Sequence, residues 1–406
     1  MADPTVPAHQ SAPAAHSATA SPSRAAPTAA LRDPRLDFFR GIAMFIILIA
    51  HVPNDWLALW IPARFGFSDA TETFVFCSGM ASAIAFGRVF RERGMMMGTA
   101  RVSYRIWQVY WAHIGLFIAI AATMVALNAS LPEGRDYVGQ LNLYPFFNNP
   151  QPQLLGLLTL TYVPNYFDIL PMYLVILAMM PLMIGLARVH VGLMIAVSVA
   201  IWLSANILGW NFPAEPWSAR EWFFNPLGWQ LVFFTGFAFM AGWIPAPPRS
   251  ALLFWLAVAV ILITVPFAYF KIFREVDWLL AWRKDYAFLI NKTDFGVLRY
   301  IHFLATAYVA WILVGPKGAR IVPSQGAAWL GQAWGALLSV IMKVGQQSLA
   351  VFISSMFLAR LLGVLFDQVG RTHWSMLWVN LLGFALIIGV AYGAAWIKSQ
   401  PWKKAR

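Results

Sequence analysis

The chain has 406 residues, of which 60% are hydrophobic and only 11% are charged. Soluble domains carry about 25% charged residues, so this composition excludes an ordinary globular protein, and its apolar content excludes a chain that is disordered throughout. The net charge of +12 does not indicate nucleic-acid binding, because the basic residues lie in short segments between apolar runs rather than in one patch. The single cysteine, Cys77, excludes an intramolecular disulfide.

Long uncharged runs predict an all-α polytopic protein embedded in the lipid bilayer. No Asp, Glu, Lys or Arg occurs in 106–132, 189–214, 222–248, 250–270 and 372–397, and about 20 apolar residues cross the hydrocarbon core as a helix. Counting apolar segments predicts about ten transmembrane helices, within 38–58, 70–90, 104–128, 167–187, 191–210, 226–244, 251–270, 298–314, 346–366 and 376–397. The Gly-rich apolar segment 327–345 is interpreted as either a re-entrant or a surface helix.

The ends of the chain differ from this membrane region. Residues 1–30 are rich in Ala, Pro, Ser and Thr and contain no apolar run, which is typical of a disordered tail rather than a signal peptide. We expect a membrane domain at 31–398 between that tail and a short basic tail at 399–406. The distribution of Lys and Arg favours both termini in the cytoplasm.

Two long segments on the opposite side, 129–166 and 271–297, are rich in aromatic and amide residues. Such residues suit stacking on sugars, but for any single aromatic residue the sequence favours the aromatic belt at a membrane interface. The 271–299 segment is also an exception to the charge bias, because it contains six Lys and Arg residues. It either receives an anionic group or reflects the tolerance of long loops for charge.

The first apolar segment carries three ionisable residues on one helical stripe. Arg40 and His51 are eleven residues apart, which places them about 20° apart around a helix and roughly 16 Å apart along it. Asp37 lies one turn before Arg40. Ionisable residues inside a span are costly and indicate function, and here His51 suits a general base and Arg40 a phosphate ligand. Alternatively, Arg40 anchors the helix at the interface and His51 caps it before Pro53.

Two carboxylates open the second apolar segment. Asp69 and Glu72 are three residues apart and share a helix face, where they can orient and charge-stabilise a neighbouring histidine. The alternative is that Ser68 caps this helix and the acidic residues interact with its dipole. The sequence favours neither interpretation.

Further polar residues stand where later spans begin. Asp168 begins the span within 167–187, and Lys292, Arg299 and His302 flank the start of the span within 298–314. Arg299 and His302 are one turn apart and share a face. No nucleotide-binding, serine-hydrolase or metalloprotease motif and no Cys/His cluster occurs in the sequence, so we expect no metal site.

At these residues the chain resembles the OpgC family, integral-membrane succinyltransferases that act on osmoregulated periplasmic glucans. The resemblance covers residues 32 to about 352 and rests on the Arg40-x10-His51 spacing and six ordered motifs: RDPRLDFFRG, FGFSDATETFVFCSG, YFDILPMY, FNPLGWQLVFFTG, LRYIHFLA and GQQSLAVF. The family is similar to a branch of the acyltransferase 3 superfamily, which implies a bundle of ten helices.

The resemblance implies transfer of an acyl group, succinyl in the named members, from cytoplasmic acyl-CoA to a hydroxyl of a periplasmic glucan. It also implies a bacterial inner membrane and no permanently bound cofactor. His51 matches the essential histidine of the superfamily, as a base or a transient acyl carrier, and Arg40 matches its partner arginine. Asp69 and Glu72 match the acidic motif of the next helix.

The remaining candidates are assigned by position. We expect Asp37 beside Arg40 at the donor site, and we expect the substrate to contact four residues: Asp168, Lys292, Arg299 and His302. An inward-facing Arg299 would suit the terminal carboxylate of a succinyl group, whereas an outward-facing one would only anchor its helix. The alternative function is a proton- or anion-coupled transporter, which would use the same buried His, Asp and Arg residues. The sequence does not indicate an oligomeric state.

Overall fold

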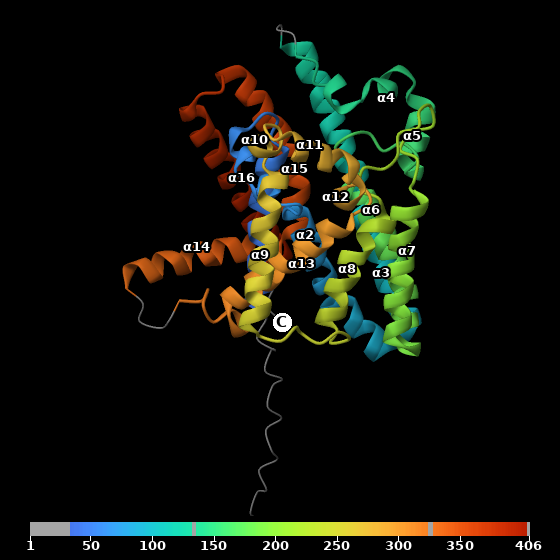
Figure 1. Ribbon diagram of the computed structural model, residues 1–406. Helices are drawn as coiled ribbons and strands as arrows, with labels where there is room; N and C mark the ends of the chain where they lie inside the picture. The colour runs from blue at the N-terminus through green and yellow to red at the C-terminus, as the bar shows by residue number, and fades with distance from the viewer. Residues whose placement is uncertain (1–32, 132–134, 324–327, 404–406) are drawn as a thin grey trace, which may run out of the picture. The chain divides into compact units, whose positions relative to one another are not determined.

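The computed structural model describes residues 33–131, 135–323 and 328–403, and every regular element in these ranges is a helix (Figure 1). In this part of the chain the only bridged extended residues are Pro213 and Glu221, which form an isolated pair. The predicted all-α class is therefore confirmed. The predicted tail at 1–30 lies outside the described residues, as do residues 404–406 of the predicted basic tail.

Each predicted span overlaps one of the main helices. These are α1 (Pro34–His51), α2 (Ala70–Ser82), α3 (Arg88–Ser130), α6 (Ile169–Val189), α7 (Val191–Leu208), α8 (Pro226–Met240), α9 (Ala251–Ala268), α13 (Val297–Val314), α14 (Trp329–Gln346), α15 (Ser348–Val369) and α16 (His373–Ser399). Short helices lie between them: α4 (Tyr144–Asn148), α5 (Pro150–Thr159), α10 (Phe270–Phe273), α11 (Asp277–Asp285) and α12 (Ala287–Ile290).

Among the described residues, seven helical segments are long and apolar enough to cross a membrane. One of them, Ala70–Ser130, has 61 residues because α2 continues into α3 through the π-helical turn Ala83–Gly87. At 1.5 Å per residue this run is about 90 Å long, about three times the thickness of the hydrocarbon core. Gly94 interrupts it with a φ of 81°, a left-handed conformation that favours glycine, so the run contains two predicted spans.

The helices α1 and α8 fall outside this set for different reasons. α1 carries Arg35, Asp37 and Arg40 in its first two turns, and α8 has only 15 residues. Both are nevertheless well packed, α1 against α2, α14 and α15, and α8 against α2, α6 and α7. α8 buries Trp229 and Phe233 completely.

Glycines allow the helices that carry polar residues to approach closely. A Cβ on Gly79 of α2 would strike the backbone of Phe233 in α8, and one on Gly345 of α14 would strike the backbone of Asp37 in α1. Close contact through small residues is typical of helix pairs in membranes. These contacts position α1 and α2, the two helices whose ionisable residues the sequence singled out.

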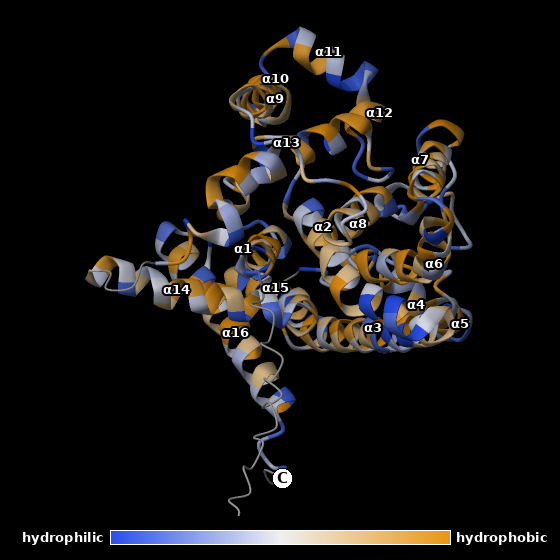
Figure 2. Cartoon of the chain, turned by 90° about the horizontal axis from the view of Figure 1, so that it is seen from below, coloured by the Kyte–Doolittle hydropathy of each residue, from blue (hydrophilic) through white to orange (hydrophobic). Residues whose placement is uncertain are grey.

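The helix α9 shows why the protein needs a lipid environment. Only Ala257 and Thr264 of its 18 residues are buried, although the helix is apolar enough to cross a membrane. Figure 2 looks down the axis of α9 and shows it mostly in the orange of hydrophobic residues. Leu252, Trp255 and Ile263 are each more than half exposed. Apolar surface of this extent is stable only when lipid or protein covers it, which supports an integral membrane protein.

The sequence predicts a re-entrant or a surface helix at 327–345, and residues 329–345 of this segment lie in the single uninterrupted helix α14. It packs along α1 and runs across the direction of α9 (Figure 1). Its apolar residues Trp329, Leu330 and Leu337 are exposed. This arrangement favours the surface-helix interpretation.

Candidate active site

A cavity of about 570 Å³ lies where α1 ends and where α2, α6 and α13 begin. Five of the predicted site residues line it: His51, Asp69, Asp168, Lys292 and Arg299. The fold thus brings together residues from all three thirds of the chain. Glu72 and His302 lie directly behind this wall, whereas Asp37 and Arg40 lie at the other end of α1.

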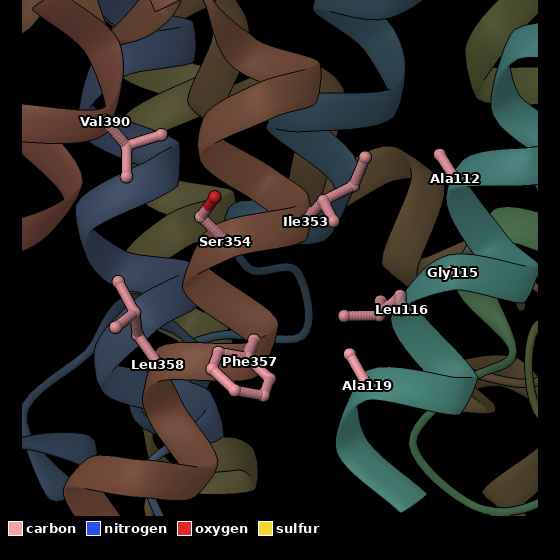
Figure 3. Close-up of a pocket in the computed structure, with 9 residues that line it drawn as sticks. All are labelled: Ala112, Gly115, Leu116, Ala119, Ile353, Ser354, Phe357, Leu358 and Val390. Atoms are coloured by element: carbon pink, nitrogen blue, oxygen red, sulfur yellow. The ribbon is translucent and has the colours of Figure 1, made fainter. Parts of the chain in front are cut away.

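A second cavity of about 440 Å³ lies between α3 and α15, next to α16 (Figure 3). Its lining side chains are apolar except for the hydroxyl of Ser354. No carboxylate, imidazole or cationic group lines it, so the larger cavity is the candidate site for chemistry.

Two acidic and two basic side chains form a network of ion pairs at the start of α2, in which only Lys292 is substantially exposed. Lys292 Nζ lies 2.6 Å from Asp69 Oδ2, and Arg299 Nε lies 2.6 Å from Glu72 Oε1. Arg299 Nη2 is also 3.6 Å from Asp69 Oδ2. Glu72 is fully buried and the Arg299 side chain is 10% exposed. The guanidinium of Arg299 therefore faces two carboxylates at the wall of the cavity.

Asp69 and Glu72 also cap their own helix. The structure therefore combines features of both interpretations of these carboxylates, the capping of α2 and the contact with other charged groups. The capping residue is Asp69 rather than Ser68: Asp69 Oδ1 accepts from the Thr71 N–H at 2.6 Å, and Glu72 Oε2 accepts from the Asp69 N–H at 2.8 Å. This is a capping box. Each carboxylate uses one oxygen for the helix and the other for a cation.

His51 is the last residue of α1. Its Nδ1 lies 2.7 Å from the Ile47 carbonyl oxygen, and because a carbonyl only accepts, Nδ1 carries the proton. In the neutral ring Nε2 is then an acceptor. Tyr166 contacts the imidazole edge to face, with ring centroids 5.4 Å apart. Neither Asp69 nor Glu72 is hydrogen-bonded to His51 in the described structure, so Ile47 and Tyr166 are what orient it.

Asp168 and His302 bind the segments that frame the cavity. Asp168 Oδ1 accepts from the backbone N–H of Phe223 at 3.0 Å. His302 Nδ1 accepts from the Ser68 N–H at 3.2 Å and lies 2.7 Å from Ser68 Oγ. Its Nε2 is buried without a hydrogen-bond partner. His302 therefore fixes the residues just before α2 rather than lining the cavity.

Arg40 and Asp37 occupy a separate site near the start of α1. Arg40 hydrogen-bonds to Ser348 Oγ, and Lys398 Nζ hydrogen-bonds to Gln347 Oε1 at 2.6 Å. Two cations from α1 and α16 thus bind neighbouring residues at the junction of α14 and α15. Asp37 is 1% exposed.

Sequence reasoning missed Tyr166 and Arg360. Arg360 is buried in α15 with its guanidinium over the Tyr166 ring, 5.4 Å from the centroid. It is the only charged residue between Lys343 and Asp367, and an ionisable residue inside an apolar span is itself a functional signal. That signal was available in the sequence. Tyr166 had none, because it is one aromatic residue among many.

Within the described ranges, no group of three or more His, Cys, Asp or Glu side chains is arranged to hold a metal ion. The chain matches the family model described as OpgC protein over residues 32–399. No curated protein and no solved structure is similar enough to match the chain.

Proposed function

Because the chain belongs to the OpgC family, we propose that it is a membrane-bound O-acyltransferase that moves a succinyl group from succinyl-CoA to a hydroxyl of a periplasmic glucan. The family implies an acyltransferase role, an acyl donor and a glucan acceptor. The observation that carries the proposal is the tautomer of His51. Its Nδ1 proton is held by Ile47, which leaves Nε2 as a base beside a cavity with polar walls.

In the proposed reaction His51 is the general base. Nε2 takes the proton of the acceptor hydroxyl while the hydroxyl oxygen attacks the thioester carbonyl carbon. The C–S bond of the tetrahedral intermediate then breaks and the ester stays on the sugar. The CoA sulfur leaves with the proton that His51 returns, so atoms and charge balance.

The network of ion pairs at the start of α2 supplies positive charge where the reaction develops negative charge. Lys292 has three N–H groups and uses one for Asp69, so it can donate to the oxygen of the tetrahedral intermediate. Asp69 and Glu72 hold Lys292 and Arg299 at the cavity wall. We therefore propose that Asp69 and Glu72 serve catalysis as positioning residues, with Arg299 and His302 as the residues that keep the wall in place.

Asp168 is the proposed acceptor-binding residue. One of its oxygens binds the Phe223 N–H, which leaves Oδ2 for a sugar hydroxyl. Phe223 and Phe224 line the same cavity and offer apolar faces on which a sugar ring can pack.

The proposed donor site is the junction of α14 and α15. Arg40 and Lys398 bring two positive charges to Ser348 and Gln347, which suits the phosphates of CoA. Asp37, one turn from Arg40, balances part of this charge. Arg40 and His51 lie roughly 16 Å apart along α1, so an extended pantetheine arm would connect the two sites.

The proposed topology has about ten transmembrane helices in an acyltransferase 3-like bundle, in a bacterial inner membrane with both termini cytoplasmic. Residues 31–398 form the acyltransferase domain, with tails at 1–30 and 399–406. The start of α1 and the end of α16 then lie on the donor side, and His51 lies toward the acceptor side.

The test uses the full chain in lipid nanodiscs with succinyl-CoA labelled in the acyl group and a glucan acceptor. The proposal expects label on the glucan and free CoA thiol in equal amounts. Label that stays wholly on CoA, while proteoliposomes carry the glucan or succinate across the bilayer, would contradict the enzyme and favour the transporter.

A further inference from the structure

Arg360 is a buried cation without a carboxylate partner. It is 7% exposed and donates from Nη2 to Gln140 Oε1 at 3.0 Å, and its Nε is buried with no hydrogen-bond partner. Among the described residues no carboxylate lies within ion-pair distance of it. Asp367, seven residues further along α15, acts on Arg360 electrostatically, but its ion pairs are with Arg135 at 2.8 Å and Arg371 at 2.7 Å. A buried guanidinium is costly unless an anion compensates it.

Tyr166 connects Arg360 to the candidate active site. The Arg360 guanidinium carbon and the His51 ring centroid each lie 5.4 Å from the centroid of the Tyr166 ring. The two groups are therefore no more than twice that distance apart. Tyr166 and Met356 line the cavity, and Arg360 follows Met356 by one helical turn.

The backbone holds Tyr166 in an unfavourable conformation. Its φ of 87° is disfavoured for a residue with a side chain, and its hydroxyl donates to the Met356 carbonyl at 2.6 Å. Such strain persists where the surrounding structure fixes a residue, and it is concentrated at functional sites. The Tyr166 ring is thus fixed in position, and both His51 and Arg360 contact it.

The other cations at the cavity are less suited to bind an anion. Lys292 is paired with Asp69, and Arg299 faces both Glu72 and Asp69. Arg64 and Arg283 also line the cavity, but they are more exposed than Arg360, so water competes for their donors.

We propose that Arg360 and Gln140 bind the free carboxylate of a dicarboxylic acyl group and so select it over neutral acyl groups. This inference rests on the acyl transfer proposed above. Arg360 presents Nε and an Nη group to the two carboxylate oxygens. The Gln140 amide, whose oxygen accepts from Arg360, retains its own N–H groups for the same anion. The acyl chain runs past the Tyr166 ring, with its reacting carbonyl at His51.

The test is a competition between succinyl-CoA and acetyl-CoA for transfer to glucan by the full chain in nanodiscs. The measured quantity is the succinyl-to-acetyl ratio of kcat/KM. Arg360→Gln is expected to lower this ratio about tenfold or more, because a charged hydrogen-bonded pair is lost, while acetyl transfer stays within a few-fold of wild type. Arg360→Lys keeps the positive charge but loses the planar pair of N–H donors, so it should give an intermediate ratio.

The matched control is Arg188→Gln, which removes a guanidinium that donates to the Phe90 carbonyl oxygen at the far end of α6 and should leave the ratio unchanged. Gln140→Leu, at an exposed position, should lower the ratio by a few-fold. If Arg360→Gln does not fold, Arg360→Lys and Gln140→Leu decide the matter by the same ratio.

An unchanged ratio in the active Arg360 and Gln140 variants overturns the inference. A wild-type protein that transfers acetyl as readily as succinyl also overturns it, while leaving acyl transfer intact. A wild-type protein that transfers neither group contradicts the proposed function itself.

Discussion

We expect the effects of replacing Arg299 and of replacing Glu72 on the free energy of unfolding to depend strongly on each other. Glu72 is fully buried, and its Oε1 lies 2.6 Å from Arg299 Nε. Removing one partner of a buried pair costs about 3–5 kcal/mol, because the other charge is left uncompensated. We expect Arg299→Gln to lower the free energy of unfolding by about this amount. Glu72→Gln should cost less, because Asp69 still lies 3.6 Å from Arg299 Nη2.

A double-mutant cycle measures this coupling. The assay is unfolding in mixed detergent micelles, followed by circular dichroism for the wild type, both single variants and the double variant. In the double variant no uncompensated charge is created at this pair, so its loss of stability should be smaller than the sum of the two single losses by at least about 1 kcal/mol.

The exposed pair Arg88–Glu92 supplies the control. Its atoms are 2.8 Å apart but its side chains are 71% and 56% exposed, so its coupling should be no more than about 0.5 kcal/mol. Additive losses for Arg299 and Glu72, or a coupling no larger than that of the control pair, would refute the network of ion pairs as a source of stability.

Three further predictions concern function and orientation. His51→Ala should lower acyl transfer by about 10²–10⁴-fold without loss of CoA binding, because only the base is removed; near-normal transfer would remove His51 from the mechanism. Lys398→Gln should raise the KM for succinyl-CoA and leave the KM for glucan unchanged, and the opposite pattern would place the donor elsewhere. Single cysteines introduced at 88–105 should be labelled only from the cytoplasm, and those at 135–166 only from the periplasm. The native Cys77 should not react, because it is buried. Reversed labelling would overturn the orientation.

The helical architecture followed from patterns local in the sequence. Apolar runs indicate where the helices lie, and each predicted span overlaps a helix of the structure. The continuous run from α2 into α3 was not expected, because the residues near Gly94 are polar and resemble a loop. The sequence does not distinguish a re-entrant helix from a surface helix at 327–345. The structure favours the surface helix, because the apolar face that α14 exposes depends on how the helix packs along α1.

The sequence identifies individual residues of the candidate site but not the contacts between them. The ionisable residues were recognised individually, because charge inside an apolar span is visible in the sequence. The pairing of Asp69 with Lys292, and of Glu72 with Arg299, joins segments more than 200 residues apart, and no local pattern encodes such contacts. For the same reason the sequence predicts a substrate-binding role for Arg299 but does not reveal its carboxylate partners.

The most direct test of the central claim is mass spectrometry of the periplasmic glucan from cells that produce the wild-type protein or its His51→Ala variant. The account predicts succinyl esters on the glucan of wild-type cells and their loss in the variant, at equal protein levels in the membrane. Glucan that carries the same substituents in both, or that carries none in the wild type, would contradict the proposal that this chain acylates a glucan through His51.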